Sequence, residues 1–341
     1  MVYVGLNGFG RIGKSIFIQL LSNKTLKIKA INITKFDLNN LASYLENDST
    51  HHYNTNWDLK IIDETKFSIN GEIIYMFNER DASHLNWKKY DNIEYVIDCT
   101  GAYLTQDDCK KHNIDYVIMC APPKDNSPQY VVSVNEEKYN GEKIVSNASC
   151  TTNCISPVLG FLEKNYKIQK ANFTTIHATT ASQNPIDTNH FNNRTSRSIL
   201  NNIIPHNTGA SKSIKALLPS LDGKVKGTSL RIPVNNVSIV DLNVTLETNV
   251  SKEELMCEME KSGYISINNR KLVSSDFNTT TTPSIIDKDA SIQLTENEFK
   301  LMIWYDNEWS YSAQVIRLAE HMVTYNNEKN NHIHPHFITN Y

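Results

Sequence analysis

The order of apolar and polar positions predicts alternating strands and helices in the first half of the chain. The apolar run at residues 2–6 is typical of a buried strand, and the apolar stripe that follows at residues 12–21 has the spacing of one helix face. We therefore expect residues 1–149 to form an α/β domain built on a doubly wound parallel sheet. Further strand patterns lie at residues 27–32, 93–99, 116–120 and 143–145, and a hairpin with an Asn70-Gly71 turn is predicted at residues 67–75.

The second half has a different order, in which strand patterns follow one another with few helices between them. Such grouping predicts an α+β domain with a mixed sheet, which we expect to span residues 150–310. A helix at residues 311–325 is expected to pack back on the first domain, ahead of a polar tail at residues 326–341. The strand patterns lie at residues 173–178, 237–246 and 300–305, and one helix is predicted at residues 252–262.

Composition and charge narrow the class of protein. Of the 341 residues, 40% are hydrophobic and 21% are charged, and the net charge of −3 gives no reason to expect nucleic acid or a membrane as partner. No stretch approaches the roughly 20 apolar residues that span a bilayer, and no N-terminal signal pattern is visible. Six scattered cysteines favour a reducing compartment, the cytoplasm, and we expect Cys99, Cys109 and Cys120 to be buried packing residues.

A glycine-rich stretch follows the first strand pattern. Residues 7–13 read Asn-Gly-Phe-Gly-Arg-Ile-Gly, and their glycines match G-x-G-x-x-G. Glycine allows a tight turn and lets backbone N–H groups approach a pyrophosphate at a helix N-terminus. The motif alone also occurs in turns that bind nothing, but its position between a strand and a helix predicts a dinucleotide-binding turn.

Cys150 lies where the strand pattern at residues 143–145 gives way to a helix pattern that continues to Leu162. Ser149 or one of its neighbours is expected to cap this helix. Free backbone N–H groups and the helix dipole at such a junction favour thiolate over thiol, and the thiolate is the nucleophilic form. Because many cysteines at helix starts are structural, the local pattern leaves both roles open.

Two longer strings resemble those of a known family. Residues 146–154, Ser-Asn-Ala-Ser-Cys-Thr-Thr-Asn-Cys, resemble the active-site signature of the phosphorylating glyceraldehyde-3-phosphate dehydrogenases, and residues 175–183 resemble their general-base segment. The resemblance runs through nearly the whole chain and implies oxidation of D-glyceraldehyde 3-phosphate with NAD or NADP. It implies that Cys150 attacks the aldehyde, that His177 takes the proton, and that inorganic phosphate cleaves the thioester to give 1,3-bisphosphoglycerate. Cys154 is expected to be a packing thiol.

The same resemblance implies which residues bind the cofactor and the two phosphate groups. Hydroxyls, backbone amides and arginine forks are the groups that a doubly charged phosphate needs, and no metal is expected. The implied cofactor residues are Asn7, Gly8, Phe9, Gly10, Arg11, Ile12, Ile33, Thr34, Lys35, Arg80, Thr100, Gly101 and Asn307. The implied residues for the substrate's phosphate are Thr180, Ser182 and Arg231, and those for inorganic phosphate are Ser149, Thr151, Thr208 and Gly209, with Arg197 nearby.

The cofactor preference is open because Ile33 stands where NAD-preferring members carry an acidic residue. Loss of that carboxylate removes an acceptor for the ribose hydroxyls and a charge that repels a 2′-phosphate. Lys35 adds a positive charge, and Arg80 matches a family arginine near the adenine ribose. These residues favour NADP or dual use, with NAD binding through its remaining contacts as the alternative.

The resemblance also implies a homotetramer, with residues 183–197 forming a loop against a neighbouring subunit's cofactor. The length of this loop fits bacterial and plastid members, but Phe191-Asn192-Asn193 departs from their pattern. Two other functions stay open, an erythrose-4-phosphate dehydrogenase that hydrolyses its thioester and a non-catalytic interaction or RNA-binding relative. Asn207-Thr208-Gly209 retains the phosphate pattern and argues against the first, and the intact catalytic residues argue against the second.

Overall fold

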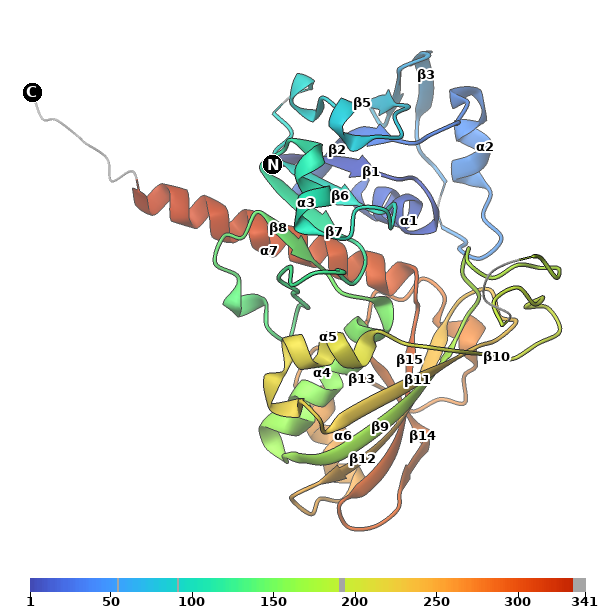
Figure 1. The fold of residues 1–341 in the computed structure, drawn as a ribbon, viewed down its shortest axis with the longest axis vertical. Helices are drawn as coiled ribbons and strands as arrows, with labels where there is room; N and C mark the ends of the chain where they lie inside the picture. The colour runs from blue at the N-terminus through green and yellow to red at the C-terminus, as the bar shows by residue number, and fades with distance from the viewer. Residues whose placement is uncertain (54, 91, 190–193, 334–341) are drawn as a thin grey trace, which may run out of the picture. The chain divides into compact units, whose positions relative to one another are not determined.

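The computed structural model describes residues 1–53, 55–90, 92–189 and 194–333, and its contacts divide the chain into two compact units (Figure 1). The first unit contains Met1–Leu38, Asp58–Asn147 and the chain from Val315 onwards. The second contains Asn39–Trp57 and Ala148–Gln314. The main division falls near residue 148, but residues 39–57 cluster with the second unit, whereas the sequence places them in the first domain.

The first unit is built on an eight-stranded sheet in the order β3-β4-β5-β2-β1-β6-β7-β8. All pairings from β5 to β8 are parallel, and the antiparallel β3 and β4 extend one side. The chain winds from β1 to one side and then from β6 to the other, so the order reverses where β1 and β6 end. Ligands of open parallel sheets bind at such a point. The strands are β1 (Val2–Asn7), β2 (Leu26–Asn32), β3 (Leu59–Asp63), β4 (Lys66–Ile69), β5 (Glu72–Phe77), β6 (Tyr95–Asp98), β7 (Tyr116–Met119) and β8 (Ile144–Ser146), and the helices are α1 (Arg11–Leu20) and α3 (Gln106–Cys109).

The second unit is built on a seven-stranded sheet in the order β10-β11-β9-β12-β15-β14-β13, in which parallel and antiparallel pairs are mixed. Along β15 buried and half-buried side chains alternate, as expected for a sheet with one covered face. The α/β and α+β predictions are therefore confirmed. The strands are β9 (Ile168–His177), β10 (Ile204–His206), β11 (Val225–Arg231), β12 (Ser238–Leu246), β13 (Ser266–Asn268), β14 (Ile285–Gln293) and β15 (Glu298–Tyr305). The helices of this unit are α2 (Leu41–Glu46), α4 (Cys150–Asn165), α5 (Ala210–Leu217) and α6 (Lys252–Lys261).

The core of the second unit lies between its sheet and helices α4, α5 and α6. Leu159 and Leu162 of α4 are fully buried, as are Leu242 of β12 and Leu301 of β15. Burying a side chain of this size stabilises a fold by about 1.5–3 kcal/mol. Helix α4 is thus anchored in the core along its length, and this fixes the position of its first residue, Cys150.

The last helix, α7 (Trp309–Ile333), is longer than predicted at both ends. Its start is fixed by Asp306, whose Oδ1 accepts the backbone N–H groups of Glu308 and Trp309. The prediction of a polar tail from residue 326 is wrong as far as residue 333, which is helical. Asn326 is buried, and its amide donates to the hydroxyls of Tyr95 and Tyr139 within the first unit, so its polarity does not mark an exposed segment. Residues 334–341 of the predicted tail lie outside the described residues.

Candidate active site

The strand-to-helix junction at Cys150 has the geometry that the sequence predicts. Cys150 is the first residue of α4, and the Ser149 side chain caps the helix by accepting the backbone N–H of Thr152. Ala148 has a left-handed backbone with φ of 54°, which is strained for a residue with a Cβ. The hydroxyl of Tyr311 donates to the Ala148 carbonyl at 3.0 Å. The surroundings therefore hold the turn that presents Cys150.

Cys150 and His177 lie within contact distance. Sγ of Cys150 is 3.4 Å from Nε2 of His177, which is buried at the end of β9. Arg231 ends the neighbouring β11, and the parallel pairing of the two strands puts it opposite His177. Its Nη1 lies 2.5 Å from His177 Nδ1. Strand register thus completes a group of thiol, imidazole and guanidinium.

Two contacts compete for Nδ1 of His177. The Ala178 carbonyl oxygen lies 2.7 Å from it and requires a proton on Nδ1, whereas the Arg231 guanidinium requires a lone pair there. Arg231 Nη1 also donates to the Ala178 carbonyl at 3.1 Å. When the Ala178 carbonyl accepts a hydrogen bond from Nδ1–H, Nε2 carries a lone pair. That lone pair faces Cys150 and can accept a proton from its thiol.

The pKa of Cys150 does not follow the prediction for a cysteine at a helix start. Burial raises the pKa of Cys150, while the Arg231 charge and the Thr151 backbone N–H lower it less strongly. The expected thiolate-favouring effect of the helix start is therefore outweighed by burial. Burial first and the Arg231 charge second lower the pKa of His177 to about 3, so the imidazole is neutral near pH 7.

Tyr305 is a site residue that the sequence reasoning missed. It is buried on β15, and its hydroxyl lies 3.0 Å from Thr151 Oγ1 and 2.8 Å from Thr175 Oγ1. Thr151 follows Cys150, and Thr175 precedes His177 by two residues on β9. Tyr305 therefore ties the segment of the thiol to the segment of the imidazole.

Asn307 is held by a second residue that the sequence did not mark. The hydroxyl of Ser238 donates to Asn307 Oδ1 at 2.8 Å and accepts the backbone N–H of Ala178 at 3.0 Å. These bonds connect the amide to the residue that follows His177. Ser238 reaches both residues because it begins β12, which pairs with β9 on one side and with β15 on the other.

The residues implied for the substrate's phosphate lie in one connected loop region. Thr180 and Ser182 contact each other through their hydroxyls at 3.1 Å, and both bond to the amide of Gln183. Thr179 donates to the carbonyl of Ile232, next to Arg231, so the loop after β9 is bonded to the loop after β11. The structure therefore brings Thr180, Ser182 and Arg231 to the same end of the sheet.

The residues implied for inorganic phosphate are less closely connected. Ser149 and Thr151 flank Cys150, whereas Thr208 and Gly209 precede α5, which packs on α4. Arg197 forms an exposed ion pair with Asp187 at 3.0 Å. In the part of the chain that the structure describes, Arg197, Thr208 and Gly209 make no hydrogen bond with Cys150 or His177. The divergent residues Phe191–Asn193 lie outside the described residues.

The glycine turn in the first unit leaves no room for side chains where it is tightest. Gly8 has φ of 92°, and a Cβ on Gly13 would lie 2.1 Å from the Gly8 carbonyl oxygen. Gly10 is the N-cap residue of α1, where no side chain caps the helix, and a Cβ there would meet open space. Among the other predicted residues, Phe9 is buried and packs edge-on against Phe17, and Arg11 and Ile12 begin α1. The first N–H groups of α1 are not capped by a side chain, and the glycines of the turn let a ligand approach the backbone closely. Both features fit a pyrophosphate.

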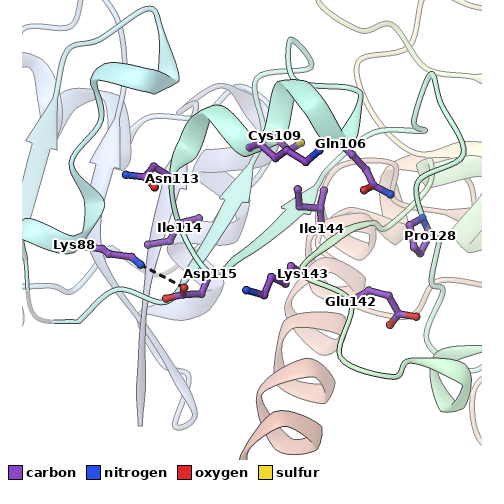
Figure 2. Close-up of a pocket in the computed structure, with 11 residues that line it drawn as sticks. Lys88, Gln106, Cys109, Asn113, Ile114, Asp115, Pro128, Glu142, Lys143 and Ile144 are labelled. Carbon is purple, nitrogen blue, oxygen red and sulfur yellow. Dashed lines mark hydrogen bonds and ion pairs between the residues drawn. The ribbon is translucent and has the colours of Figure 1, made fainter.

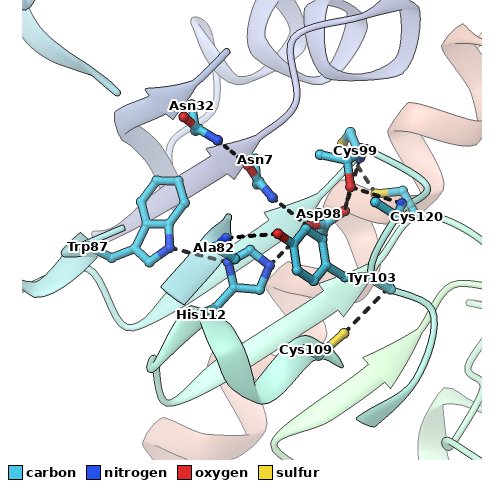
Figure 3. Close-up of polar contacts among 12 residues, drawn as sticks. Asn7, Asn32, Ala82, Trp87, Asp98, Cys99, Tyr103, Cys109, His112 and Cys120 are labelled. Atoms are coloured by element: carbon cyan, nitrogen blue, oxygen red, sulfur yellow. Dashed lines mark hydrogen bonds and ion pairs between the residues drawn. The ribbon is translucent and has the colours of Figure 1, made fainter. Parts of the chain in front are cut away.

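Asn7 belongs to a buried polar network (Figure 3). Its amide donates to Asp98 Oδ2 at 2.7 Å, and Asn32 donates to its Oδ1 at 2.7 Å. His112 lies 3.0 Å from the same carboxylate oxygen, while Thr100 donates to Oδ1 of Asp98. The sequence reasoning did not single out Asp98 or His112. The Asn7 side chain thus braces the ends of β1, β2 and β6.

The residues implied for the adenosine end lie where β2 and β5 finish. Ile33 follows β2 and its N–H donates to Phe77 of β5, while Lys35 is exposed and its N–H donates to Asn78 Oδ1 at 3.0 Å. Thr34 and Arg80 are exposed as well, and Thr100 and Gly101 form the turn after β6. No carboxylate occupies the position of Ile33.

A cavity of about 490 Å³ in the first unit contains none of the predicted site residues (Figure 2). It lies around α3 and the segment before β8, and an ion pair between Lys88 and Asp115 at 3.3 Å spans part of its wall. Among the described residues, no cluster of three His, Cys, Asp or Glu side chains is arranged to hold a metal. Within the same residues, no helix is long and apolar enough to cross a membrane.

Comparisons with known proteins decide the family. The model of the glyceraldehyde 3-phosphate dehydrogenase NAD binding domain matches residues 2–106, and that of the C-terminal domain matches residues 149–307. The chain belongs to the glyceraldehyde 3-phosphate dehydrogenase family. Its membership indicates an NAD-dependent oxidoreductase that acts on an aldehyde.

Individual relatives cover almost the whole chain. Glyceraldehyde-3-phosphate dehydrogenase A of Escherichia coli (strain K12) is 38% identical over 332 residues, which are 94% of this chain and 99% of that protein. The cytosolic glyceraldehyde-3-phosphate dehydrogenase of Leishmania mexicana is 38% identical over 331 residues, with the same coverage. The resemblance inferred from the motif strings is confirmed.

Proposed function

We propose that this glyceraldehyde 3-phosphate dehydrogenase family member oxidises D-glyceraldehyde 3-phosphate with NAD or NADP and inorganic phosphate to 1,3-bisphosphoglycerate. The observation that carries the proposal is the contact of 3.4 Å between Cys150 Sγ and His177 Nε2, with Arg231 beside the imidazole. A nucleophile, a base and a cation for an anionic substrate are then adjacent.

In this proposal the Cys150 thiol passes its proton to Nε2 of His177 while its sulfur attacks the aldehyde carbon, and Nε2 then gives that proton to the aldehyde oxygen, which completes a thiohemiacetal. The backbone N–H of Cys150 and Nε2 of His177 steady the oxygen, and His177 takes its proton as hydride leaves. The open glycine turn between β1 and α1 would hold the pyrophosphate of the nicotinamide cofactor, which would supply the hydride acceptor when bound. Inorganic phosphate then attacks the thioester and releases the acyl phosphate, which frees Cys150.

Arg231 is proposed to bind the substrate's phosphate together with Thr180 and Ser182. In the described part of the chain its Nε is buried without a hydrogen-bond partner and no carboxylate pairs with its charge. Ser149, Thr151, Thr208 and Gly209, with Arg197 nearby, are proposed to receive inorganic phosphate through hydroxyls and N–H groups. Asn307, oriented by Ser238, is proposed to hold the nicotinamide carboxamide.

Substitution of the two catalytic residues tests the chemistry. Cys150→Ala is expected to abolish oxidation, and His177→Asn is expected to leave slow turnover, since the thiol can still react without its base. Omitting phosphate should stop acyl-phosphate release while sparing the first turnover. Unchanged rates in either variant would contradict the assignment, and full turnover without phosphate would favour the hydrolytic erythrose-4-phosphate activity.

The cofactor is proposed to be NADP or both nucleotides. Ile33 in place of an acidic residue, with exposed Lys35 and Arg80 nearby, supports this preference. The test compares kcat/KM for NAD and NADP in the natural chain and in Ile33→Asp. The variant is expected to shift the ratio towards NAD by about tenfold or more, because the carboxylate accepts from the ribose hydroxyls of NAD and repels the 2′-phosphate of NADP. Tenfold corresponds to about 1.4 kcal/mol. A strong NAD preference in the natural chain would refute the proposal.

A homotetramer is proposed from the exposed apolar side chains around the long loop. Ile186, Leu200 and Ile203 are 70%, 63% and 66% exposed in the single chain. Clusters of exposed apolar side chains mark surfaces that associate. Sedimentation velocity is expected to give four chains, and Ile203→Lys should weaken the assembly. A concentration-independent monomer would contradict the proposal.

A further inference from the structure

A pair of cysteines lies at the carboxyl ends of β6 and β7, outside the group around Cys150. The thiol of Cys99 donates to Sγ of Cys120, and the two sulfurs are 3.5 Å apart (Figure 3). Both residues are half-buried, whereas Cys109 is fully buried. The prediction of buried packing residues is therefore wrong for Cys99 and Cys120, because each follows the last residue of its strand.

The strand register allows the two sulfurs to be joined. Asp98 and Met119 are opposite each other in the parallel ladder, so the next residues, Cys99 and Cys120, are neighbours. The ladder continues past them, since the Cys120 N–H donates to the Asp98 carbonyl at 2.9 Å. Adjacent strands lie about 4.8 Å apart, which is inside the range of about 4.4–6.8 Å that a disulfide requires between its Cα atoms.

We propose that Cys99 and Cys120 form a reversible disulfide that weakens nucleotide binding. The oxidant is a small-molecule disulfide such as oxidised glutathione. The Cys120 thiolate attacks one glutathione sulfur and expels the other glutathione as a thiolate. Cys99 then loses its proton and attacks Sγ of Cys120, which breaks the mixed disulfide and releases the second glutathione. Two protein thiols are oxidised and one glutathione disulfide is reduced to two thiols.

The order of the two steps follows from the hydrogen bond between the thiols. Cys99 donates its S–H, so Cys120 carries the acceptor sulfur and is the one that attacks first. Burial, with Cys120 as the next cause, raises the pKa of Cys99 well above its ordinary value. Cys99 is thus suited to the second step, in which the mixed disulfide lies directly against it.

Cys99 is packed against the glycine turn, which gives the bridge its expected effect. Its N–H donates to the Asn7 carbonyl at 2.7 Å, and its Cβ lies 3.8 Å from the place of a Gly13 Cβ. Its carbonyl carbon lies 3.1 Å from the place of a Gly8 Cβ. β6 lies between β1 and β7, so bringing the sulfurs from 3.5 Å to a bond of about 2.05 Å draws Cys99 towards β7 and away from the glycine turn that it supports. The inference rests on NAD binding by the first unit and is independent of the chemistry at Cys150.

The bridge is tested by mass spectrometry of the full-length chain. A Cys150→Ser background removes the competing thiol at the active site. After treatment with oxidised glutathione and blocking of free thiols with N-ethylmaleimide, digestion is expected to yield the peptides of Cys99 and Cys120 joined together, and dithiothreitol should separate them. Cys120→Ser should abolish the joined species, while Cys109→Ser, a buried thiol of the same unit, should retain it. Glutathione adducts on Cys99 or Cys120 without a joined species would overturn the proposal.

The effect on the nucleotide is tested by calorimetric titration of the same samples with NAD. The bridged protein is expected to bind about fivefold or more weakly, with recovery after reduction and no change in Cys120→Ser. An unchanged Kd in the bridged protein would overturn the coupling to the turn. Failure of the reduced protein to bind either NAD or NADP would instead contradict the proposed function, and the mass measurement would still decide whether the bridge forms.

Discussion

Arg231 is the charge nearest to the proposed catalytic pair, so its replacement tests the electrostatics of the site. Its Nη1 lies 2.5 Å from His177 Nδ1, and His177 Nε2 lies 3.4 Å from Cys150 Sγ. These contacts place the guanidinium within about 8 Å of the sulfur, where an effective dielectric constant of about 20 gives about 2 kcal/mol. One pKa unit corresponds to about 1.4 kcal/mol, so loss of the cation should raise the pKa of Cys150 by about 1.5 units.

The assay is the pH dependence of Cys150 alkylation by iodoacetamide, followed by mass spectrometry. It is done in a His177→Asn background, because the titration of His177 would otherwise be coupled to that of the thiol. Arg231→Leu should move the midpoint up by about 1.5 pH units and slow alkylation about 30-fold well below both midpoints. Arg231→Lys retains the charge and should recover most of the rate.

Arg270→Leu is the matched control, since Arg270 is an exposed arginine of the same unit. Its midpoint should equal that of the background. A midpoint that is the same in Arg231→Leu and Arg270→Leu would refute the reasoning, because the guanidinium would then not act on the thiol. Thermal unfolding of each variant distinguishes a loss of charge from a loss of fold.

Three further predictions follow from single contacts. Ser149→Ala removes the cap that accepts the Thr152 N–H and should lower the free energy of unfolding in urea by about 1 kcal/mol. Gly13→Ala places a methyl group on the backbone of the glycine turn and should abolish NAD binding in calorimetry, whereas Gly10→Ala meets open space and should keep the melting temperature. The pKa of His177 is about 3 in the folded chain against an ordinary 6.5, so the unfolded chain binds more protons between these values. The free energy of unfolding should therefore fall as the pH drops from 6.5 towards 3, and an equal slope in His177→Asn would contradict this.

The strands of the first unit are predictable because a parallel sheet buries both of its faces. β6 is buried at every position and β7 at all but one, so each is a continuous apolar run. β3 was not predicted, since it exposes most of its side chains and is held by antiparallel pairing with β4. A strand that is fixed by backbone hydrogen bonds at the edge of a sheet carries little hydrophobic pattern.

The proposed catalytic pair and its supporting residues differ in how far the sequence reveals them. Cys150 and His177 lie in strings that identify them. Tyr305 contacts Thr175 across 130 positions of the chain, and Ser238 reaches Asn307 from another strand. These contacts depend on strand register in a mixed sheet, which no local pattern of residue types specifies.

The balance of charge in the second unit connects substrate binding with preparation of the base. A buried cation without a partner is costly, and among the described residues Arg231 bonds only to His177 and the Ala178 carbonyl. If Arg231 binds the substrate's phosphate as proposed, that phosphate supplies the missing anion, and a guanidinium drawn towards it no longer occupies Nδ1. Nδ1 then donates its proton to the Ala178 carbonyl, and Nε2 faces Cys150 as an acceptor. The Arg231 charge, which is the second cause of the low pKa of His177, is weakened at the same time. An aldehyde without a phosphate leaves the guanidinium against the ring, so it should lose kcat as well as affinity.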